Sequence, residues 1–408
     1  MQTEKKPLGL YIHVPFCKSK CVYCDFYSLP QAETRMDAYT RAVIAQLTET
    51  APRAALHRVD SIYFGGGTPS FLGKKRLLKI LKTIGKLYDV DKNAEITCEG
   101  NPDSALDWRA LRALRRGGFT RISLGMQSAN DDELQDIGRV HTASQTVQAV
   151  AAIRRAKLPD LSLDLIYGLP HQTMERWQEN LAAAIALRPE HLSCYGLKVE
   201  PGTPLFEGQA QAELPGDEVQ AEMYLYTVQT LAAAGYQQYE ISNFALPGHA
   251  SRHNLKYWTL QEYAGFGPGA HSDFGEVRYA FARDLEGYIS GVLAGAPLLS
   301  ESETLPLAQR DTEYLMLRLR LTEGLDPADY QRLFRRSFAL FLPFLERNRA
   351  AGYAVCVDGR WHLTPEGFLV SNQIIGGLLD VLAEDKRRRQ EATARGDFRV
   401  VPQQTETV

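Results

Sequence analysis

The alternation of strands and helices in the first half of the chain constrains its fold most. Between residue 8 and about residue 200, runs rich in β-branched residues alternate with longer helical stretches such as MDAYTRAVIAQLTE and MERWQENLAAAIAL. This order predicts an α/β fold with a parallel sheet and right-handed crossovers. Six such units fit either an open doubly wound sheet or a partial (β/α)6 barrel. The six strand candidates are LGLYIHV, VDSIYFG, AEITCEG, RISLGMQ, LSLDLIYG and HLSCYGLKV, whose nearly continuous apolar runs predict burial on both faces.

The pattern changes near residue 200, at the Pro/Gly-rich segment EPGTPLFEGQAQAELPGD. We expect an α/β domain over residues 1–200, an α+β extension over 201–299 and a C-terminal module over 300–385. In that module, helical stretches lead into YAVCVDGRWHLTPEG, a predicted hairpin with DG at its turn. Helices followed by a small hairpin are typical of a winged-helix-like module. Residues 386–408 are charged and poor in large apolar side chains, so we expect a disordered tail.

The charge balance argues against nucleic acid as a partner. The chain has 46 Lys and Arg against 49 Asp and Glu, a net charge of −3. Winged-helix modules often bind DNA, but residues 301–385 hold 9 Arg, no Lys and 13 Asp and Glu, a net of −4. A surface that binds phosphates requires the opposite sign. We therefore interpret the module as a structural or partner-binding appendage.

The composition predicts a cytoplasmic protein. The N-terminal sequence has no apolar run long enough for a secretion signal, and no run approaches the roughly 18 apolar residues of a membrane-spanning helix. Three of the six cysteines lie in one short segment, which does not resemble a disulfide framework. A reducing compartment, in which thiolates stay available for metal, fits this pattern better.

Three cysteines near the N-terminus predict an iron–sulfur cluster. They have the spacing C-x3-C-x2-C. A structural zinc site takes four ligands, usually as two C-x2-C pairs, and only one such pair is present. Cluster thiolates normally number four, so a set of three leaves one iron open to a ligand from outside the protein. The three residues are Cys17, Cys21 and Cys24, and the remaining cysteines, Cys98, Cys194 and Cys356, are isolated.

Polar residues and glycines follow the predicted strands. Ligands bind at the C-terminal ends of strands in α/β sheets and barrels, so these residues are candidates for a binding site. For the glycines in FGGGTPS, the alternative interpretation is an ordinary glycine-rich turn. For Arg139, it is a solvent-exposed arginine at a helix end. The candidates are Gly65, Gly66, Gly67 and Thr68 in FGGGTPS, Glu99 in CEGNP, Gln127 in SLGMQS, Asp164 in LSLDLIYG and Arg139 in DIGRVHT.

Taken together, these motifs resemble one branch of the radical S-adenosylmethionine (SAM) superfamily. The resemblance rests on YIHVPFCKSKCVYCDF, FGGGTPS, CEGNP, RISLGMQS, IGRVHT and DLIYGLP, and it extends to about residue 380. The branch contains the oxygen-independent coproporphyrinogen III oxidases and the HemW heme chaperones. The resemblance implies a partial (β/α)6 barrel, with a 4Fe-4S cluster on the three cysteines and SAM on its open iron. It further implies SAM contacts at Tyr11, Gly66, Gly67, Thr68, Glu99, Gln127, Arg139 and Asp164.

Two features favour the chaperone over the oxidase. The oxidase pattern continues to a fourth cysteine, whose position is Phe26 here, and a phenyl ring has no proton or redox chemistry to replace a thiol. HNLKYW at 253–258 matches a motif of the HemW type, which implies heme ligation by His253. Tyr257 and Trp258 then pack against the macrocycle. The alternative is that His253 bonds to backbone and the aromatic residues belong to the core. His271 in GFGPGAHS is a second candidate, as ligand or as structural histidine.

We therefore expect a heme chaperone that binds heme, a 4Fe-4S cluster and SAM, and transfers heme to respiratory proteins. The first alternative is the oxygen-independent coproporphyrinogen III oxidase, against which Phe26 argues. The second is a radical SAM enzyme that acts on nucleic acid, against which the acidic C-terminal module argues. Peripheral contact with the inner membrane and a homodimer are both compatible with the sequence.

Overall fold

The computed structural model of the chain describes residues 5–208 and 213–395. The chain divides after Pro306 into two compact units. Within the part described, no helix is both long and apolar enough to cross a membrane.

Six parallel strands form the centre of the first unit, and each overlaps one of the predicted strands, two of which end before the predicted residue. They pair in chain order, without the reversal that a doubly wound sheet requires. All crossovers therefore wind in one direction, as in the wall of a barrel, and the wall is open because its first and last strands do not pair. The strands are β1 (Lys6–Val14), β4 (His57–Gly66), β5 (Val90–Gly100), β6 (Arg121–Gln127), β7 (Asp160–Tyr167) and β8 (His191–Gly196).

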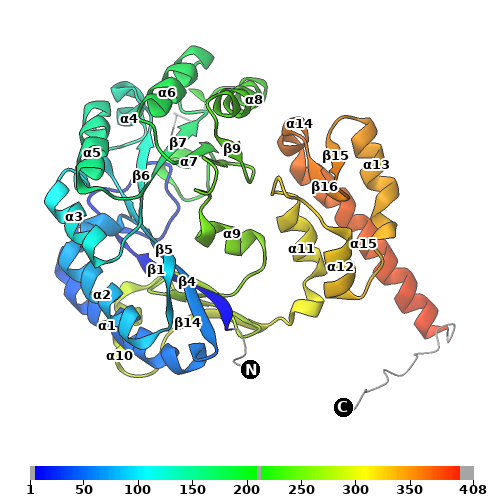
Figure 1. Ribbon diagram of the computed structural model, residues 1–408, viewed down its shortest axis with the longest axis horizontal. Helices are drawn as coiled ribbons and strands as arrows, with labels where there is room; N and C mark the ends of the chain where they lie inside the picture. The colour runs from blue at the N-terminus through cyan, green and yellow to red at the C-terminus, as the bar shows by residue number, and fades with distance from the viewer. Residues whose placement is uncertain (1–4, 209–212, 396–408) are drawn as a thin grey trace. The chain divides into compact units, whose positions relative to one another are not determined.

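Helices cover the outside of this wall (Figure 1). Apolar side chains on the outer face of the strands, including Phe64, Leu124 and Leu163, are fully buried against them. Local signals set the helix ends: a capping box at Thr142 and Gln145 begins α5, and Gly118, with φ 118°, ends α3. The helices are α1 (Met36–Thr50), α2 (Lys74–Leu87), α3 (Trp108–Gly117), α4 (Asp131–Asp136), α5 (Ala143–Ala156) and α6 (Met174–Ala186).

The inner face of the wall is polar, which the apolar reading of these strands did not predict. Side chains alternate between the two faces of a strand. In β6, for example, Ile122 and Leu124 face the helices, whereas Ser123, between them, lines an internal cavity. The same alternation in the neighbouring strands places Thr97, Ser162, His191 and Ser193 around that cavity. The interior of the barrel is therefore a polar well.

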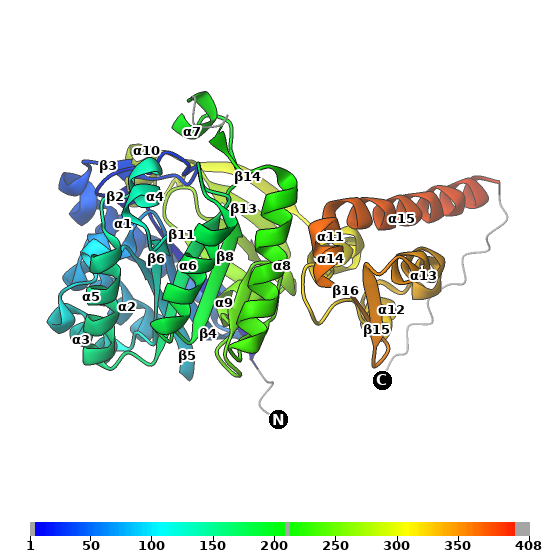
Figure 2. The ribbon, with the colours of Figure 1, turned by 90° about the horizontal axis from the view of Figure 1, so that it is seen from above.

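Residues 201–299 extend the sheet at both edges and form no separate body. Beyond β8 lie β10 (Asn243–Ala245) and β9 (Gln237–Gln238), and beyond β1 lie β11 (Tyr263–Phe266), β12 (His271–Phe274), β13 (Val277–Phe281) and β14 (Leu299–Thr304), giving one sheet of twelve strands. The helices of this segment are α7 (Pro204–Glu207), α8 (Asp217–Ala233), α9 (Arg252–Trp258) and α10 (Leu285–Leu293), and Figure 2 shows α8 beside β8. The first compact unit thus continues about 100 residues beyond the expected boundary at residue 200. A separate two-stranded sheet pairs β2 (Phe16–Cys17) with β3 (Leu29–Pro30).

The second unit contains helices, a hairpin and a long final helix, in the predicted order. Its core is aromatic: the buried ring of Tyr330 packs against Tyr314, Phe334, Phe338 and Phe341. Asp358 and Gly359 at the hairpin turn have φ of 50° and 79°, the positive values that a two-residue DG turn requires. The elements are α11 (Asp311–Arg318), α12 (Pro327–Phe334), α13 (Leu342–Ala350), β15 (Ala354–Val357), β16 (Arg360–Leu363), α14 (Pro365–Leu369) and α15 (Ser371–Ala394).

The expected disordered tail is partly wrong, because α15 continues through Ala394. The composition of this segment suggested disorder, but its charges alternate at helical spacing. Arg388 pairs with Glu384 and Arg389 with Asp385, each one turn apart. Such pairs stabilise an exposed helix by a few tenths of a kcal/mol each, roughly 0.3–0.5. Residues 396–408 of the expected tail lie outside the described part of the chain.

A candidate SAM and iron–sulfur site in the barrel

A cavity of about 490 Å³ opens inside the barrel, and all three cysteines of the N-terminal motif line it. Residues from β4, β5, β6, β7 and β8 form its wall, and the segment after β2 forms part of its rim. The cavity begins at the C-terminal ends of the parallel strands, where ligands bind in barrel enzymes. Seven of the eight predicted SAM contacts line it: Gly66, Gly67, Thr68, Glu99, Gln127, Arg139 and Asp164.

The three thiols differ in their surroundings. Cys17 is buried and shares a hydrogen bond with Thr68 Oγ1 at 3.4 Å, whereas Arg139 donates to Cys21 Sγ at 3.5 Å. Burial raises the pKa of Cys17, and it raises the pKa of Cys24 to about 11. Cys24 is therefore a neutral thiol at neutral pH until a metal displaces its proton.

The glycine turn after β4 is joined to the start of the cysteine segment. The amide of Gly67 donates to the carbonyl of Val14, and that of Thr68 donates to the carbonyl of Phe16. A Cβ at Gly67 would lie 2.8 Å from the carbonyl oxygen of Phe16. Gly66 has φ 105°, and a Cβ there would lie 2.6 Å from the ring of His13. The two glycines thus let the chain pass close to its neighbours, which an ordinary exposed turn does not require.

Two carboxyl groups, Glu99 and Asp164, face the interior of the barrel. Glu99 accepts hydrogen bonds from Tyr63 Oη at 2.7 Å and from the Gly66 amide at 3.2 Å, yet its burial raises its pKa to about 7. Asp164 accepts from Ser123 at 2.9 Å, and burial raises its pKa as well. Both groups therefore sit where a ligand with hydrogen-bond donors or positive charge would stabilise the carboxylate form.

Gln127 and Arg139 form the far side of the cavity. Gln127 has φ 62°, a left-handed conformation uncommon for this residue type, and its buried Oε1 has no hydrogen-bond partner among the described residues. Arg139 is not the solvent-exposed helix-end residue of the alternative reading. Its guanidinium donates to Asn101 Oδ1 at 2.7 Å and to the Gly125 carbonyl at 2.8 Å. Asn101 also donates to Thr68 Oγ1, so it links two walls of the cavity.

The eighth predicted contact, Tyr11, does not line the cavity. Its ring stacks on Tyr63 with centroids 6.2 Å apart, and its hydroxyl bonds to His13 Nδ1 at 3.1 Å. Tyr63 and Asn101 do line the cavity, although neither was singled out from the sequence. The alternation of inward and outward residues along each strand would have indicated Tyr63, two positions before Gly65.

His253 does not fit heme ligation in this structure. It is fully buried in α9 and does not line the cavity. Both ring nitrogens are engaged, Nδ1 with Ser61 Oγ and Nε2 with Tyr257 Oη, each at 2.9 Å. The alternative, in which the His253 ring bonds to backbone, also differs from the structure, because both ring partners are side chains. His271 is half-exposed at the start of β12 and pairs with Glu301 at 3.3 Å.

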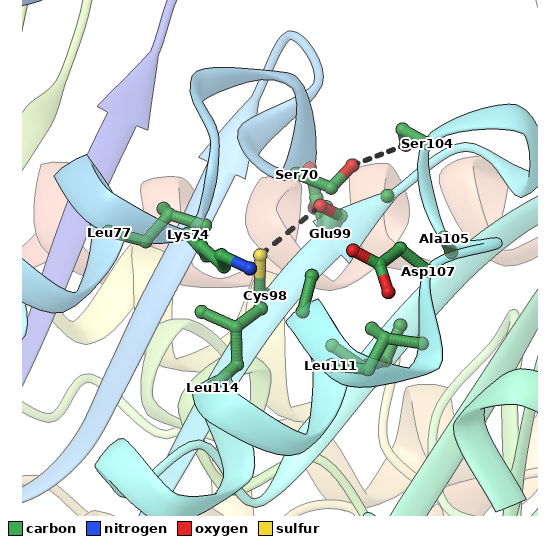
Figure 3. Close-up of a pocket in the computed structure, with 13 residues that line it drawn as sticks. Ser70, Lys74, Leu77, Cys98, Glu99, Ser104, Ala105, Asp107, Leu111 and Leu114 are labelled. Carbon is green, nitrogen blue, oxygen red and sulfur yellow. Dashed lines mark hydrogen bonds between the residues drawn. The ribbon is translucent and has the colours of Figure 1, made fainter. Parts of the chain in front are cut away.

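A second, much smaller pocket lies on the outer side of β5, between that strand and α3 (Figure 3). It holds about 40 Å³, enough for one or two water molecules. Cys98 lines it and therefore points away from the three cysteines of the main cavity. Cys98 is thus a packing residue of the outer layer.

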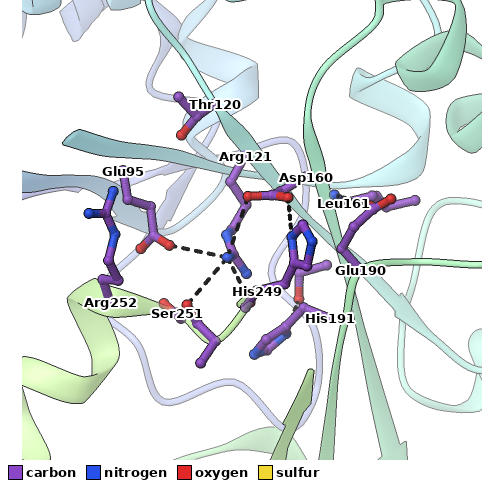
Figure 4. Close-up of polar contacts among 12 residues, drawn as sticks. Glu95, Thr120, Arg121, Asp160, Leu161, Glu190, His191, His249, Ser251 and Arg252 are labelled. Atoms are coloured by element: carbon purple, nitrogen blue, oxygen red, sulfur yellow. Dashed lines mark hydrogen bonds and ion pairs between the residues drawn. The ribbon is translucent and has the colours of Figure 1, made fainter. Parts of the chain in front are cut away.

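An ion network lies at the N-terminal ends of the strands (Figure 4). Arg121 is almost fully buried and pairs with Glu95 at 3.1 Å and Asp160 at 3.7 Å. It also donates to the carbonyl of His249 at 2.8 Å, and the His249 ring bonds to Asp160 at 2.6 Å. These contacts attach the segment before α9 to β5, β6 and β7.

Comparisons with known proteins agree with this geometry. The radical SAM superfamily model matches residues 11–184, and the model of the HemN C-terminal domain matches residues 305–370. Curated relatives named heme chaperone HemW are 34% identical in Haemophilus influenzae, over 90% of this chain and 97% of the relative, and 32% identical in Bacillus subtilis, over 91% and 99%. The chain belongs to the HemW family.

The fold agrees with that of a radical SAM enzyme. The solved structure of coproporphyrinogen III oxidase (HemN) from Escherichia coli superposes with a TM-score of 0.81. The match covers 92% of this chain and 91% of that one, at 23% identity. This chain and the oxidase thus share one mixed α/β architecture with a large parallel core.

The residues present fit the cluster and SAM that the superfamily implies. Among the described residues, no group of three His, Cys, Asp or Glu side chains is arranged to hold one metal ion. The three thiols of the motif line one cavity, and in a cluster each thiolate binds a different iron. The unpartnered Oε1 of Gln127 leaves a polar group available to a small ligand in the same cavity.

Proposed function

We propose that this protein is a heme chaperone that carries a 4Fe-4S cluster and SAM and transfers heme to respiratory proteins. Cys17, Cys21 and Cys24 would hold the cluster, and SAM would bind its open iron between the Gly66–Thr68 turn and the two carboxyl groups. When bound, this pair supplies redox chemistry and a sulfonium; the residues of the chain bind, orient and shield them. Membership in the HemW family and Phe26, where the oxidase pattern has a cysteine, support this function over porphyrinogen decarboxylation.

The observation that carries the heme part of the proposal is an apolar rim on the cavity. Phe26 and Tyr195 both line the cavity, and they are 62% and 40% exposed. Exposed aromatic rings at the rim of a cavity can bury apolar surface against a ligand, and their flat faces match a macrocycle. Lys20, which also lines the cavity and is exposed, carries the charge that a heme carboxylate needs, whereas Lys198 pairs with Glu200 at the same rim. We therefore place heme at this rim.

Heme titration of the anaerobically reconstituted protein tests the proposal. The double variant Phe26→Ala with Tyr195→Ala should bind heme at least tenfold more weakly, since each ring contributes about 1 kcal/mol or more of contact. Phe206→Ala is the matched control, because Phe206 is similarly exposed but does not line the cavity. Equal affinity in the double variant would disprove the rim site. A wild-type protein that binds no heme and converts coproporphyrinogen III would disprove the chaperone function.

The C-terminal unit is proposed to be a winged-helix-like appendage that contacts a protein partner. Its net charge of −4 over residues 301–385 supports a protein partner over nucleic acid. We propose that the protein is cytoplasmic and makes peripheral contact with the inner membrane, where respiratory proteins would receive heme.

A further inference from the structure

The ring of His253 is enclosed by residues of β1, β4 and α9, which form the floor of the barrel. Its backbone amide donates to Glu95 Oε1 at 3.2 Å at the start of α9, and its ring extends toward β1 and β4. Gly9 in β1 leaves space for it: a Cβ at Gly9 would lie 3.0 Å from His253 Cε1. Ser61 in β4 and Tyr257 one turn further along α9 take the two ring nitrogens. No lone pair of this imidazole faces an open space.

The same ring belongs to a stack of three aromatic rings. His253 lies 5.3 Å from the ring of Tyr63 at an angle of 22°, and 6.3 Å from Tyr11 at 25°. Burial, with a smaller effect from the ammonium of Lys256, lowers the pKa of His253 to about 3. The ring is therefore neutral and packs as an uncharged aromatic group.

Two hydrogen-bonded routes lead from this stack to the cavity. Tyr63 donates to Glu99 Oε1 at 2.7 Å, which fixes the carboxyl group proposed to contact SAM. Tyr11 bonds to His13, whose Nε2 bonds to the carbonyl of Tyr27 at 2.8 Å, three residues after Cys24. The position of the stack thus determines where Glu99 and the end of the cysteine segment lie.

We propose that His253 is a positioning residue for the SAM pocket, acting through Tyr63 on Glu99, and is not the axial ligand of heme. This inference rests on the proposed SAM site, and it corrects the role that the HNLKYW motif suggested. Tyr257 contacts the His253 ring, and its own ring packs at nearly right angles to that of Tyr263, with the two centroids 4.7 Å apart. Tyr257 of the motif thus supports the floor of the barrel.

The test compares His253→Ala with His253→Phe in the reconstituted protein that carries its cluster. Phe keeps the stacked ring but has no nitrogen to bind iron. SAM affinity is measured by equilibrium dialysis and by the change that SAM causes in the electron paramagnetic resonance spectrum of the reduced cluster. We expect roughly tenfold weaker SAM binding for the Ala variant, largely restored in the Phe variant, because the support of one charge-assisted hydrogen bond is lost. Heme absorbance should be unchanged in both.

Loss of the heme spectrum in both variants, with SAM affinity unchanged, would overturn the inference. Tyr63→Phe provides a second measurement should the Ala variant fail to fold, because it removes only the hydroxyl that reaches Glu99. It should weaken SAM binding to a similar extent, and an unchanged SAM affinity would also overturn the inference. Failure of the wild type to bind heme would disprove the proposed chaperone function but would leave the SAM measurements decisive for His253.

Discussion

At the residue scale, the cavity gathers polar and ionisable groups that are withdrawn from water. One buried and two partly buried thiols, two partly buried carboxyl groups and the unpartnered amide oxygen of Gln127 share one polar space. Their hydrogen bonds within the protein offset only part of their loss of hydration. Such groups persist in a folded protein when a ligand completes their contacts, which is why the residues are best explained together as a binding site.

Replacement of Cys24 by Ser should abolish the absorbance of the reconstituted cluster, because the two remaining thiolates cannot hold it. Ultraviolet–visible spectra and iron content after anaerobic reconstitution measure this. Cys356→Ser is the control, since Cys356 is an exposed cysteine of the second compact unit. A Cys24→Ser protein with a full complement of iron would rule out the three-thiolate site.

Replacement of Glu99 by Gln should change how the stability of the ligand-free protein depends on pH. The folded-state pKa of about 7 lies above the unfolded value near 4.5, so the folded state binds more protons between these values. Its stability therefore falls as pH rises from about 4.5 to 7, by at most about 3 kcal/mol from this group. The variant should lack this part of the decline in thermal unfolding curves recorded from pH 5 to pH 8. Parallel curves for both proteins would contradict the assignment.

At the scale of elements, the sequence predicted which segments form strands and helices. It did not predict how the strands pair or that their inner faces are polar. All six parallel strands were expected because β-branched runs and helical periodicity are local signals. The order of pairing is a long-range property, so the barrel could not be told from a doubly wound sheet. The polar inner face was missed because Ser123 and Ser162 are short side chains within apolar runs. The motif that suggested heme ligation by His253 gives no information on burial, so its buried position could not be predicted from the sequence.

Substitution of Gly67 by Ala should weaken both folding and cluster uptake. The added Cβ meets two backbone carbonyls, those of Phe16 at 2.8 Å and Val14 at 2.9 Å, so the segment that leads to Cys17 must move. We expect a loss of about 1–3 kcal/mol in unfolding free energy, measured by chemical denaturation, and less bound iron. Gly85→Ala, in open space within α2, should instead stabilise the protein by about 0.5–1 kcal/mol. A Gly67→Ala protein as stable as the wild type would contradict this account.

At the scale of the whole molecule, the proposed cluster, SAM and heme contacts all lie in the first compact unit. Every residue that lines the cavity precedes Pro306. A chain that ends at Pro306 should therefore keep its cluster spectrum and its SAM and heme affinities within about twofold of the full-length protein. If the second unit contacts the receiving protein, the shortened chain should lose heme transfer in an assay with a respiratory acceptor. Undiminished transfer would argue against a partner-binding role for that unit.

The polar well has a further consequence for the life of the protein in the cell. A barrel whose centre is lined by Ser, Thr, Glu and Arg gains little from hydrophobic burial there. The proposed cluster and SAM would therefore supply contacts that stabilise this part of the fold. By mass action, a ligand present at 100 times its dissociation constant adds about 2.7 kcal/mol to the free energy of unfolding. A chain that has not received its cluster would unfold more often and be exposed to proteases. Binding of the proposed cluster and SAM would therefore couple the loading of the protein to its stability.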